Sequence, residues 1–487
     1  MKRILLGGGL LAILLAGAAS GYYLYRTHQQ RNVHGSSTVE FVSTQQEQVR
    51  PPAELTEVPW PQYGYDLARD RFAAGIDVAP PFRLLWTFRA ATLIEFPPAV
   101  AYGRLYFANN AGFFFAISAR TGLRAWRQAV GRCVAASPAV ERGRVYMTFL
   151  NKPPCNASSG ADGLVVSFEA GTGRIDWQRT IGPTETSPLV ANGLVYVGDW
   201  RGFVYAFRAK DGVLVWKTQL GGKVKGGAAL SAGTLYVGSY DGNLYALSAR
   251  TGKVVWRAAA QGSFLGNATF YATPAVAYGR VYVGATDGKM YSYGAASGKL
   301  RWSHGTGGYV YASAAVWHGL VLIGSYSGTF TAFDAATGDV RWTFRANGPI
   351  SGSPTVIRGL VYFATLKELT YALDAATGKQ VWTFPDGKYS PAVADRRRLY
   401  LVGYARVFGL LPQSAPPLRL TAAQVRADLR SAKALAGAQF LVLPSVAAAK
   451  AAARHIHGAR ICNVAVKLEK GRAARRAVVL LRADCAG

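Results

Sequence analysis

The chain has 487 residues, with 55 glycines, 12% aromatic residues and a formal net charge of +29 at pH 7. Abundant glycine without long helical periodicity excludes a helical bundle and is typical of an all-β protein with many turns. The basic excess favours polyanionic surroundings, such as anionic lipid, a cell-envelope polymer or nucleic acid. The alternative is solvated surface charge that binds no partner.

Residues 1–26 are predicted to form a transmembrane signal anchor. Lys2 and Arg3 precede an uncharged, mostly apolar run that extends to Tyr25. As an α-helix this run is long enough to span a bilayer. A signal peptide cleaved at the small residues 16–18 is the alternative. Because the cationic end stays in the cytoplasm, the rest of the chain is expected outside it, which disfavours nucleic acid as a partner.

Residues 27–58 are predicted to be a flexible linker. They are rich in Gln, Ser, Thr and Glu, contain few large apolar residues and include the pair Pro51-Pro52. Such a segment cannot bury enough apolar surface to fold by itself. It would hold the following domain away from the membrane.

Beyond the linker, tryptophan recurs with a period near 40 residues. Each of eight tryptophans closes a strand-like segment, at successive spacings of 40, 51, 39, 40, 46, 40 and 40 residues. A period of this length with four strands per repeat is typical of a β-propeller. The eight tryptophans are Trp86, Trp126, Trp177, Trp216, Trp256, Trp302, Trp342 and Trp382.

One repeat illustrates the four strands, A to D. Ser187–Val190, Val195–Gly198 and Val204–Phe207 are the predicted strands A, B and C, and a turn at Gly212 leads to strand D, which ends at Trp216. Glycine is expected at such turns because they require a residue that tolerates positive φ.

The two ends of the repeat region predict how the ring closes. Three predicted strands follow Trp382, at Ser390–Val393, Leu399–Gly403 and Arg406–Leu411, but no tryptophan closes them. Conversely, Phe82–Phe88 is a D strand with no A, B and C strands before it. We therefore expect an eight-bladed propeller of four-stranded antiparallel blades, whose last blade is completed by the N-terminal strand so that no edge stays open.

The pattern Ala-x-Asp-x-x-Thr-Gly-x-x-x-Trp, present at Ala332–Trp342 and Ala372–Trp382, resembles the tryptophan-docking motif of the PQQ-type eight-bladed propellers. Trp60–Gly64 is similar to the segment that opens their first blade. The resemblance covers residues 59–411 and implies that the eight tryptophans are structural and pack between neighbouring blades. In fold, the chain also resembles the propeller of outer-membrane assembly, which recruits unfolded β-barrel chains.

The C-terminal part of the chain differs in composition from the repeats. Residues 412–420 are rich in proline and are interpreted as a hinge, and residues 421–487 predict a small basic α+β domain. Its expected elements are helices near residues 421–435 and 445–457, a strand at Gln439–Leu443, and a hairpin of Ile461–Leu468 with Ala477–Leu481.

The four cysteines are predicted to form two disulfides. Cys133 precedes strand A of its blade and Cys155 follows strand B, so the hairpin between them brings the two together. Cys462 and Cys485 flank the C-terminal hairpin in a similar way. Metal binding is the weaker alternative because C-x-x-C spacing is absent, although two histidines precede Cys462.

The resemblance also raises quinone catalysis, which the residues do not support. Dehydrogenases of that family hold the quinone against a vicinal cysteine pair and bind Ca²⁺ through Glu, Asn and Asp. This chain has no adjacent cysteines, and Glu95, Glu185 and Asp199 are the acids found near the expected ligand face. Isolated acids are usually solvated. We therefore expect a non-enzyme with no catalytic residue, no PQQ or Ca²⁺ and no other metal.

One face of the propeller is the predicted binding surface. In an antiparallel blade the D-to-A and B-to-C connections lie on one face, here called the D–A/B–C face, and the A-to-B connections lie on the other. Both irregular spacings come from insertions on the D–A/B–C face, at Asn151–Gly163 and Gly262–Ala272. Aromatic and basic side chains also collect there, as interface anchors or as ordinary rim residues. The predicted binding residues are Arg132, Lys223, Lys225, Phe270, Tyr271, Tyr309, Tyr311, Lys388, Tyr389, Trp200, Arg201, Tyr240 and Tyr326.

These features together predict an exported, membrane-anchored and monomeric propeller. Its expected function is that of a non-catalytic scaffold that binds a protein or an anionic envelope polymer through the D–A/B–C face. A PQQ-dependent oxidoreductase acting on sugars or alcohols is the alternative.

Overall fold

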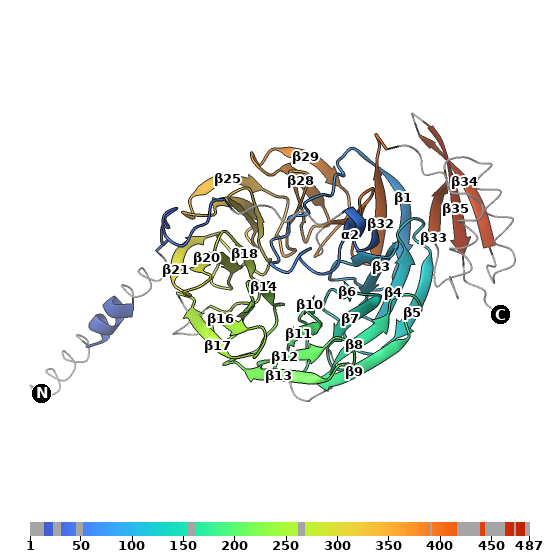
Figure 1. The fold of residues 1–487 in the computed structure, drawn as a ribbon. Helices are drawn as coiled ribbons and strands as arrows, with labels where there is room; N and C mark the ends of the chain where they lie inside the picture. Colours follow the sequence, from blue (N-terminus) through green and yellow to red (C-terminus); the bar gives the residue numbers. More distant parts are fainter. Residues whose placement is uncertain are drawn as a thin grey trace, which may run out of the picture.

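A computed structural model describes residues 14–22, 31–44, 52–153, 155, 162–261, 268–389, 392–415, 439–443, 463–471 and 474–482. The described repeats form a closed ring of eight sheets around a central axis, and each sheet contains four antiparallel strands from the repeat region (Figure 1). The predicted eight-bladed propeller is therefore confirmed. Alternation of buried and exposed side chains along the outer strands explains why these short segments pair as sheets instead of forming helices.

Blades 1 to 4 follow one another in the sequence. Their strands, in the order A to D, are β2 (Ala99–Ala101), β3 (Arg104–Ala108), β4 (Phe113–Ser118) and β5 (Arg124–Ala129); β6 (Ala139–Glu141), β7 (Arg144–Phe149), β8 (Gly163–Glu169) and β9 (Ile175–Ile181); β10 (Leu189–Ala191), β11 (Leu194–Gly198), β12 (Phe203–Arg208) and β13 (Leu214–Gln219); β14 (Ala229–Ser231), β15 (Thr234–Gly238), β16 (Asn243–Ser248) and β17 (Val254–Ala259).

Blades 5 to 7 continue the same order around the ring. Their strands are β18 (Ala275–Ala277), β19 (Arg280–Gly284), β20 (Lys289–Gly294) and β21 (Leu300–Gly305); β22 (Ala315–Trp317), β23 (Leu320–Gly324), β24 (Thr329–Asp334) and β25 (Val340–Arg345); β26 (Thr355–Ile357), β27 (Leu360–Ala364), β28 (Thr370–Asp374) and β29 (Gln380–Phe384).

Blade 8 closes the ring with strands from both ends of the repeat region. It contains β30 (Val393–Ala394), β31 (Leu399–Val402), β32 (Arg406–Pro412) and the N-terminal strand β1 (Phe82–Arg89). β1 pairs antiparallel with β32 along its whole length. The predicted closure is therefore confirmed, and it ties the two ends of the ring by backbone hydrogen bonds.

The described part of the C-terminal region extends the sheet of blade 8. β33 (Gln439–Leu443) pairs with β1, and β35 (Ala474–Arg482) pairs with both β33 and β34 (Asn463–Gly471). The predicted strand and hairpin are present in this region. The two predicted helices, as well as Cys462 and Cys485, lie outside the described residues.

The repeated tryptophans connect each blade to the next. Trp302 is fully buried, and its indole N–H donates a 2.9 Å hydrogen bond to the carbonyl of Ala335 in the following blade. Gly338 lies over the same indole with φ +78, and a Cβ there would stand 2.7 Å from the ring, so only glycine fits. The same indole-to-carbonyl bond is made by Trp86, Trp126, Trp177, Trp216, Trp256 and Trp342. Trp382, in the blade before the closure, contacts Phe82 of β1 instead (centroids 5.2 Å apart).

The segment from Trp60 to Ala73 runs around the axis on the face that carries the A-to-B connections, here called the A–B side. It hydrogen-bonds to strand A of seven successive blades, always at the same strand position. These seven strand positions are Val100, Val140, Val190, Leu230, Val276, Val316 and Val356. One short segment thus binds almost every blade, which positions its side chains at the centre of the ring.

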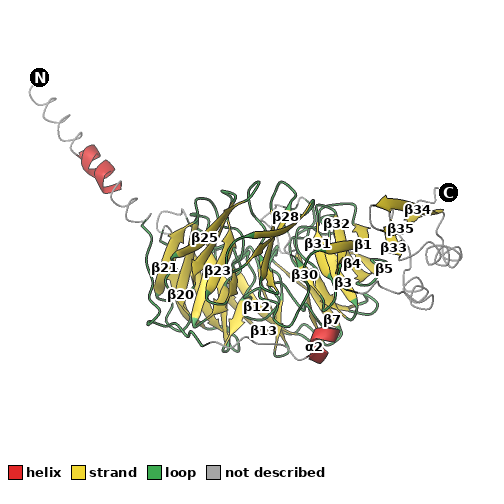
Figure 2. Ribbon diagram, turned by 90° about the horizontal axis from the view of Figure 1, so that it is seen from above, coloured by secondary structure: helices red, strands yellow, loops and turns green. Residues whose placement is uncertain are grey.

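Part of the predicted linker is bound to the ring. Residues 31–44 lie against the outer edge of blade 5, where Val33 exchanges two backbone hydrogen bonds with Ser303 (2.9 and 3.0 Å). We call residues 31–44 the strap. The fully buried Arg280 donates hydrogen bonds to three backbone carbonyls of the strap, and Glu40 of the strap forms an ion pair with Arg301. A short helix, α2 (Pro52–Glu57), lies on the A–B side of the ring (Figure 2).

The predicted membrane anchor is not confirmed. Residues 14–22 are helical, and the rest of the first 26 residues lies outside the described part. Among the described residues, none of the helices combines the length and the apolar character that are needed to cross a membrane.

Candidate binding site

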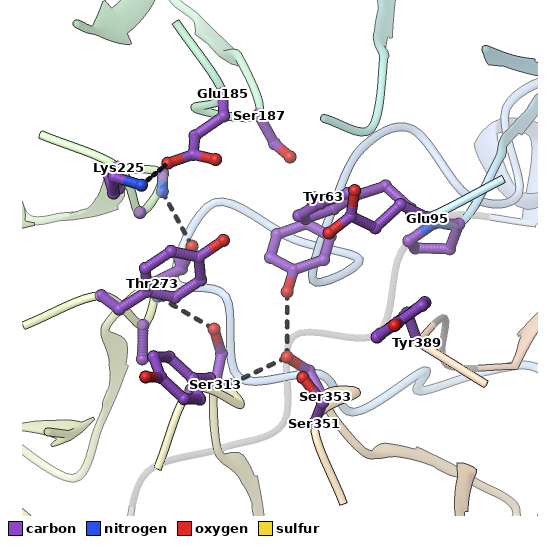
Figure 3. A pocket seen from close by; sticks show the side chains of 17 residues that line it. Tyr63, Glu95, Glu185, Ser187, Lys225, Thr273, Ser313, Ser351, Ser353 and Tyr389 are labelled. Carbon is purple, nitrogen blue, oxygen red and sulfur yellow. Dashed lines mark hydrogen bonds and ion pairs between the residues drawn. The ribbon is translucent and has the colours of Figure 1, made fainter. Parts of the chain in front are cut away.

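A small polar cavity lies on the axis at the D–A/B–C face (Figure 3). Its volume is about 60 Å³, which is room for a few water molecules. Its walls come from the D-to-A loops of several blades, because these loops converge on the axis in a propeller. The side chains that give it chemical character are Tyr63, Glu95, Glu185, Lys225, Tyr271, Tyr311 and Tyr389.

Hydroxyl groups at the start of the A strands line the cavity wall. Thr273 donates its backbone N–H to the hydroxyl of Ser313 (3.0 Å), and Ser313 donates in the same way to Ser353 (2.8 Å). The phenol of Tyr63, from the axial segment, meets the Ser353 hydroxyl at 2.9 Å, as Figure 3 shows. These contacts link neighbouring blades and fix the position of the Tyr63 phenol in the cavity.

Two buried arginines lie beneath Tyr63. The guanidinium of Arg71 stacks on the Tyr63 ring at 4.0 Å, and that of Arg69 donates to the backbone carbonyls of Tyr63, Pro188 and Ala228. Burial, together with the charge of Arg71, lowers the pKa of Arg69 to about 9. These contacts support the floor of the cavity from the A–B side.

One half of the cavity contains a complete ion pair. Glu185 accepts from the ammonium of Lys225 at 2.9 Å and from the indole N–H of Trp200 at 3.0 Å. The Lys225 ammonium also lies 4.5 Å from the Trp200 ring, 5.3 Å from Tyr240 and 5.6 Å from Tyr271. Burial raises the pKa of the Glu185 carboxyl, and Lys225 opposes this rise. A cation enclosed by aromatic rings and one carboxylate is a stable arrangement.

The other half of the cavity contains Glu95, which lies beside Tyr63 on the side away from Lys225 (Figure 3). Burial raises the pKa of the Glu95 carboxyl to about 7; the charge of Glu185 raises it further, and that of Lys225 opposes the rise. The carboxyl therefore changes charge near neutral pH.

Aromatic side chains continue from the cavity across blades 3 to 6. Tyr271 and Tyr311 meet edge to face at 5.3 Å, and Tyr311 meets Tyr326 in the same way at 5.1 Å. Tyr309, 57% exposed, lies 6.2 Å from Tyr311. We call this set the aromatic band: Trp200, Tyr240, Tyr271, Tyr309, Tyr311 and Tyr326, with Lys223 and Lys225 stacked on Trp200.

The remaining predicted binding residues do not join the aromatic band. Lys388 stacks between Tyr389 and the 47% exposed Tyr404 on blade 8. Arg201 binds Asp199 within its own turn. Phe270 is fully buried beside Tyr291 and Tyr293, so its prediction as a surface residue is wrong: the ring packs into the apolar core between blades 4 and 5.

The first insertion is held by the predicted disulfide. Cys133 and Cys155 are bonded, with their Cα atoms 5.4 Å apart, so the pairing is confirmed. The bond joins the B-to-C insertion of blade 2 to the preceding D-to-A loop. Next to the disulfide, the Arg132 guanidinium lies 3.4 Å from the carboxylate of Asp162. This predicted binding residue therefore forms an ion pair with a residue of the insertion.

Sequence reasoning missed the convergence of Tyr63, Glu95 and Glu185. The two glutamates looked like isolated surface acids, and Tyr63 belongs to a segment that precedes the first blade. One signal was present: Ser or Thr before Pro recurs at the start of strand A, as in Ser187 and Ser353, and equivalent positions in a propeller meet at the axis.

The closed ring of eight blades, joined through tryptophan and glycine residues, places the chain in the class of eight-bladed β-propellers. Within this class, residues 80–223, 200–315 and 305–415 match the family described as outer membrane protein assembly factor BamB. The chain belongs to this family.

Individual relatives are more distant. A tetrathionate hydrolase of Acidithiobacillus ferrooxidans is 31% identical over 142 residues, 26% of this chain and 28% of that protein. A BamB of Moranella endobia is 28% identical over 130 residues, 24% of this chain and 30% of that protein. The chain thus spans less than a third of the length of these curated relatives.

Solved structures show the same fold at low identity. BamB from Moraxella catarrhalis has a TM-score of 0.56 at 17% identity, and the match covers 68% of this chain and 99% of that chain. A quinohemoprotein alcohol dehydrogenase from Pseudomonas putida has a TM-score of 0.64 at 15% identity, covering 80% and 88%. At these identities the likeness concerns the fold alone.

Proposed function

We propose that the protein is a non-catalytic scaffold of the cell envelope that binds a partner protein through the D–A/B–C face. The observation that carries the proposal is the aromatic band, which extends over four neighbouring blades on the face that also carries both insertions. Tyr and Trp supply large contact areas at a small entropic cost and are enriched at interface centres. Membership in the BamB family supports the proposal.

Three features weigh against a resident quinone with its metal. The cavity of about 60 Å³ is far below the roughly 300 Å³ from which small-molecule sites begin. Of its two carboxylates, Glu185 is already held by Lys225. Among the described residues, no group of three His, Cys, Asp or Glu side chains is placed to hold a metal ion. The described residues that line this cavity therefore do not fit PQQ and Ca²⁺.

Photo-crosslinking tests which face binds. A photo-reactive amino acid at Tyr309 or Tyr404 is expected to capture a discrete protein in intact cells, and the capture should weaken when Tyr311 is changed to Ala. The control positions are Arg142 and Ala232, which are exposed in A-to-B turns on the opposite face. Capture of the same species from both faces would show that the face is wrongly assigned.

The enzymatic alternative has its own test. Purified protein is titrated with PQQ and Ca²⁺ and then supplied with an alcohol and a redox dye. A stoichiometric red-shifted cofactor spectrum together with alcohol-dependent dye reduction would refute the scaffold proposal. We expect neither.

A further inference from the structure

We propose that a groove between blades 8 and 1, on the A–B side, binds a phosphorylated ligand. Its volume is about 710 Å³, within the range of roughly 300 to 1,000 Å³ that is usual for small-molecule sites. The groove lies on the face opposite the D–A/B–C face, so the inference goes beyond the proposed function and does not depend on it. We call it the closure groove, and its charged residues are Arg104, Arg120, Asp395, Arg396, Arg397 and Arg398.

The A-to-B turn of blade 8 departs from the repeat. In blades 1 to 7 the tip of this turn is a residue followed by glycine, both with positive φ, as at Tyr102-Gly103. In blade 8 the tip is Arg396-Arg397, and neither residue has a positive φ. The Asp395 carboxylate holds this turn, because it accepts the backbone N–H groups of Arg397 and Arg398, both at 2.7 Å. The exception to the repeat thus places three consecutive arginines in one turn.

The opposite wall of the closure groove is formed by blade 1. In blade 6, Asp334 at the end of strand C and Arg341 in strand D form an ion pair at 2.7 Å. The equivalent residues of blade 1 are Ser118 and Ala125, and both line the groove. Blade 1 therefore carries neither the acid nor the long side chain of that pair, and this part of the wall is left open to a ligand.

Positive charge dominates the closure groove. Five arginines line it against one acid, Asp395, which is already paired with Arg398 at 2.9 Å. Arg104 donates to two backbone carbonyls of blade 2 at 2.9 and 2.6 Å. Arg396 donates to the hydroxyl of Thr56 in α2 at 3.3 Å. Carbonyl and hydroxyl oxygens orient a guanidinium group but do not neutralise its charge.

The acids of α2 do not cancel this charge. α2 contributes Thr56 to the closure groove and also carries Glu54 and Glu57, which line the wider groove around the axial segment. If both glutamates are counted together with Asp395, three acids still stand against five arginines. The side chains of Arg396 and Arg397 are exposed at the rim. An anion that approaches from the A–B side would therefore meet an excess of positive charge.

The kind and number of these side chains favour phosphate over a single carboxylate. Each guanidinium presents parallel N–H donors that match two oxygens of a phosphate or a carboxylate. Arginines from the walls of both blades can engage more than two oxygens, and a phosphate group supplies three acceptors together with more than one negative charge. The groove is also larger than one phosphate group. Two sources of this chemistry fit it: the headgroup of an anionic phospholipid and a soluble phosphorylated compound.

Calorimetric titration of the full chain with inorganic pyrophosphate tests the inference. At neutral pH we expect saturable binding at one site and at least about tenfold weaker binding by the double variant Arg396→Ala/Arg397→Ala. Arg120→Gln, on the opposite wall, should weaken binding in the same direction. The matched control is Arg142→Ala/Arg250→Ala, which removes two exposed arginines of the A–B side outside the groove and lowers the net charge equally. Its affinity and its Tm should equal those of the wild type.

Sedimentation with vesicles separates the two sources. If phosphatidylglycerol vesicles bind the wild type more tightly than Arg396→Ala/Arg397→Ala, and pyrophosphate competes, the ligand is a lipid headgroup. If pyrophosphate binds but the vesicles do not distinguish these two proteins, the ligand is a soluble phosphorylated compound. Both results support a phosphate site.

Three results would overturn the inference. They are the absence of saturable pyrophosphate binding, equal pyrophosphate affinity of the wild type and the groove variants, and tighter binding of a heptaglutamate peptide than of pyrophosphate. The last result would assign the groove to an acidic protein segment. Because crosslinking from Tyr309 reports on the opposite face, it is expected to be unchanged in the groove variants, and the proposed function would survive the loss of this inference.

Discussion

Replacing Glu95 by Gln is expected to stabilise the protein above neutral pH. The folded structure raises the pKa of this carboxyl from 4.5 to about 7 because it is buried beside Glu185. Between these values the folded protein binds more protons than the unfolded chain, so the free energy of unfolding falls as the pH rises from about 4.5 to 7 and is level above. Gln carries no charge and avoids this loss.

The magnitude follows from the pKa difference. At about 1.4 kcal/mol per unit, the rise to about 7 corresponds to an upper limit of about 3 kcal/mol. Because Glu95 is only half-buried by exposed area, a gain of about 1 to 3 kcal/mol is expected at pH 8, and nearly none at pH 4.5. For a ring of this size, this gain in the free energy of unfolding corresponds to a rise in Tm of about 1 to 4 °C at pH 8.

Thermal and denaturant unfolding at pH 4.5, 6, 7 and 8 provide the assay. The control is Glu368→Gln, whose partly exposed ion pair with Lys388 should contribute less than about 1 kcal/mol at every pH. A Glu95→Gln variant that is less stable than the wild type at pH 8, or whose stability difference does not grow with pH, would refute the reasoning. That result would mean that the ionised carboxylate is favourably held within the folded cavity.

The remaining predictions concern the scaffold. Trp302→Ala should lower the free energy of unfolding by about 3 to 5 kcal/mol, because the indole is fully buried; Trp302→Phe, which loses mainly the hydrogen bond to the next blade, should cost less, and equal losses would contradict the docking role. Replacing Cys133 and Cys155 by Ser opens a loop with a sequence separation of 22 and should cost about 3 kcal/mol in denaturant unfolding; unchanged stability would show that the loop is held by other contacts. Arg280→Ala removes three hydrogen bonds to the strap of residues 31–44, so tryptic cleavage after Arg31 should accelerate at least about tenfold while the ring stays folded. Cleavage at the wild-type rate would show that the strap is held elsewhere.

Much of the architecture could be predicted because a propeller blade is a local unit. Four short strands, a glycine turn and a closing tryptophan follow one another within about 40 residues, so each blade is written in a contiguous stretch. The unmatched D strand at Phe82–Phe88 and the three unmatched strands after Trp382 then specify how the ring closes, and the structure confirms this closure. The Cys133–Cys155 pair could also be predicted, because one hairpin separates the two residues.

The axial cavity was decided by the tertiary structure alone. Tyr63, Glu95 and Glu185 lie in different segments, and they meet because every D-to-A loop points to the same axis and the axial segment passes beneath them. Because these residues are far apart in the sequence, nothing in it indicates that they are buried together. Burial is the main cause of the raised pKa of Glu95. For the same reason Phe270 was expected on the surface: its exposure depends on which neighbouring blade its ring packs against, and no local pattern encodes that. The sequence by itself therefore determined the repeat, the ring and its closure, whereas the charge and shape of the candidate site arose only when distant loops were brought together at the axis.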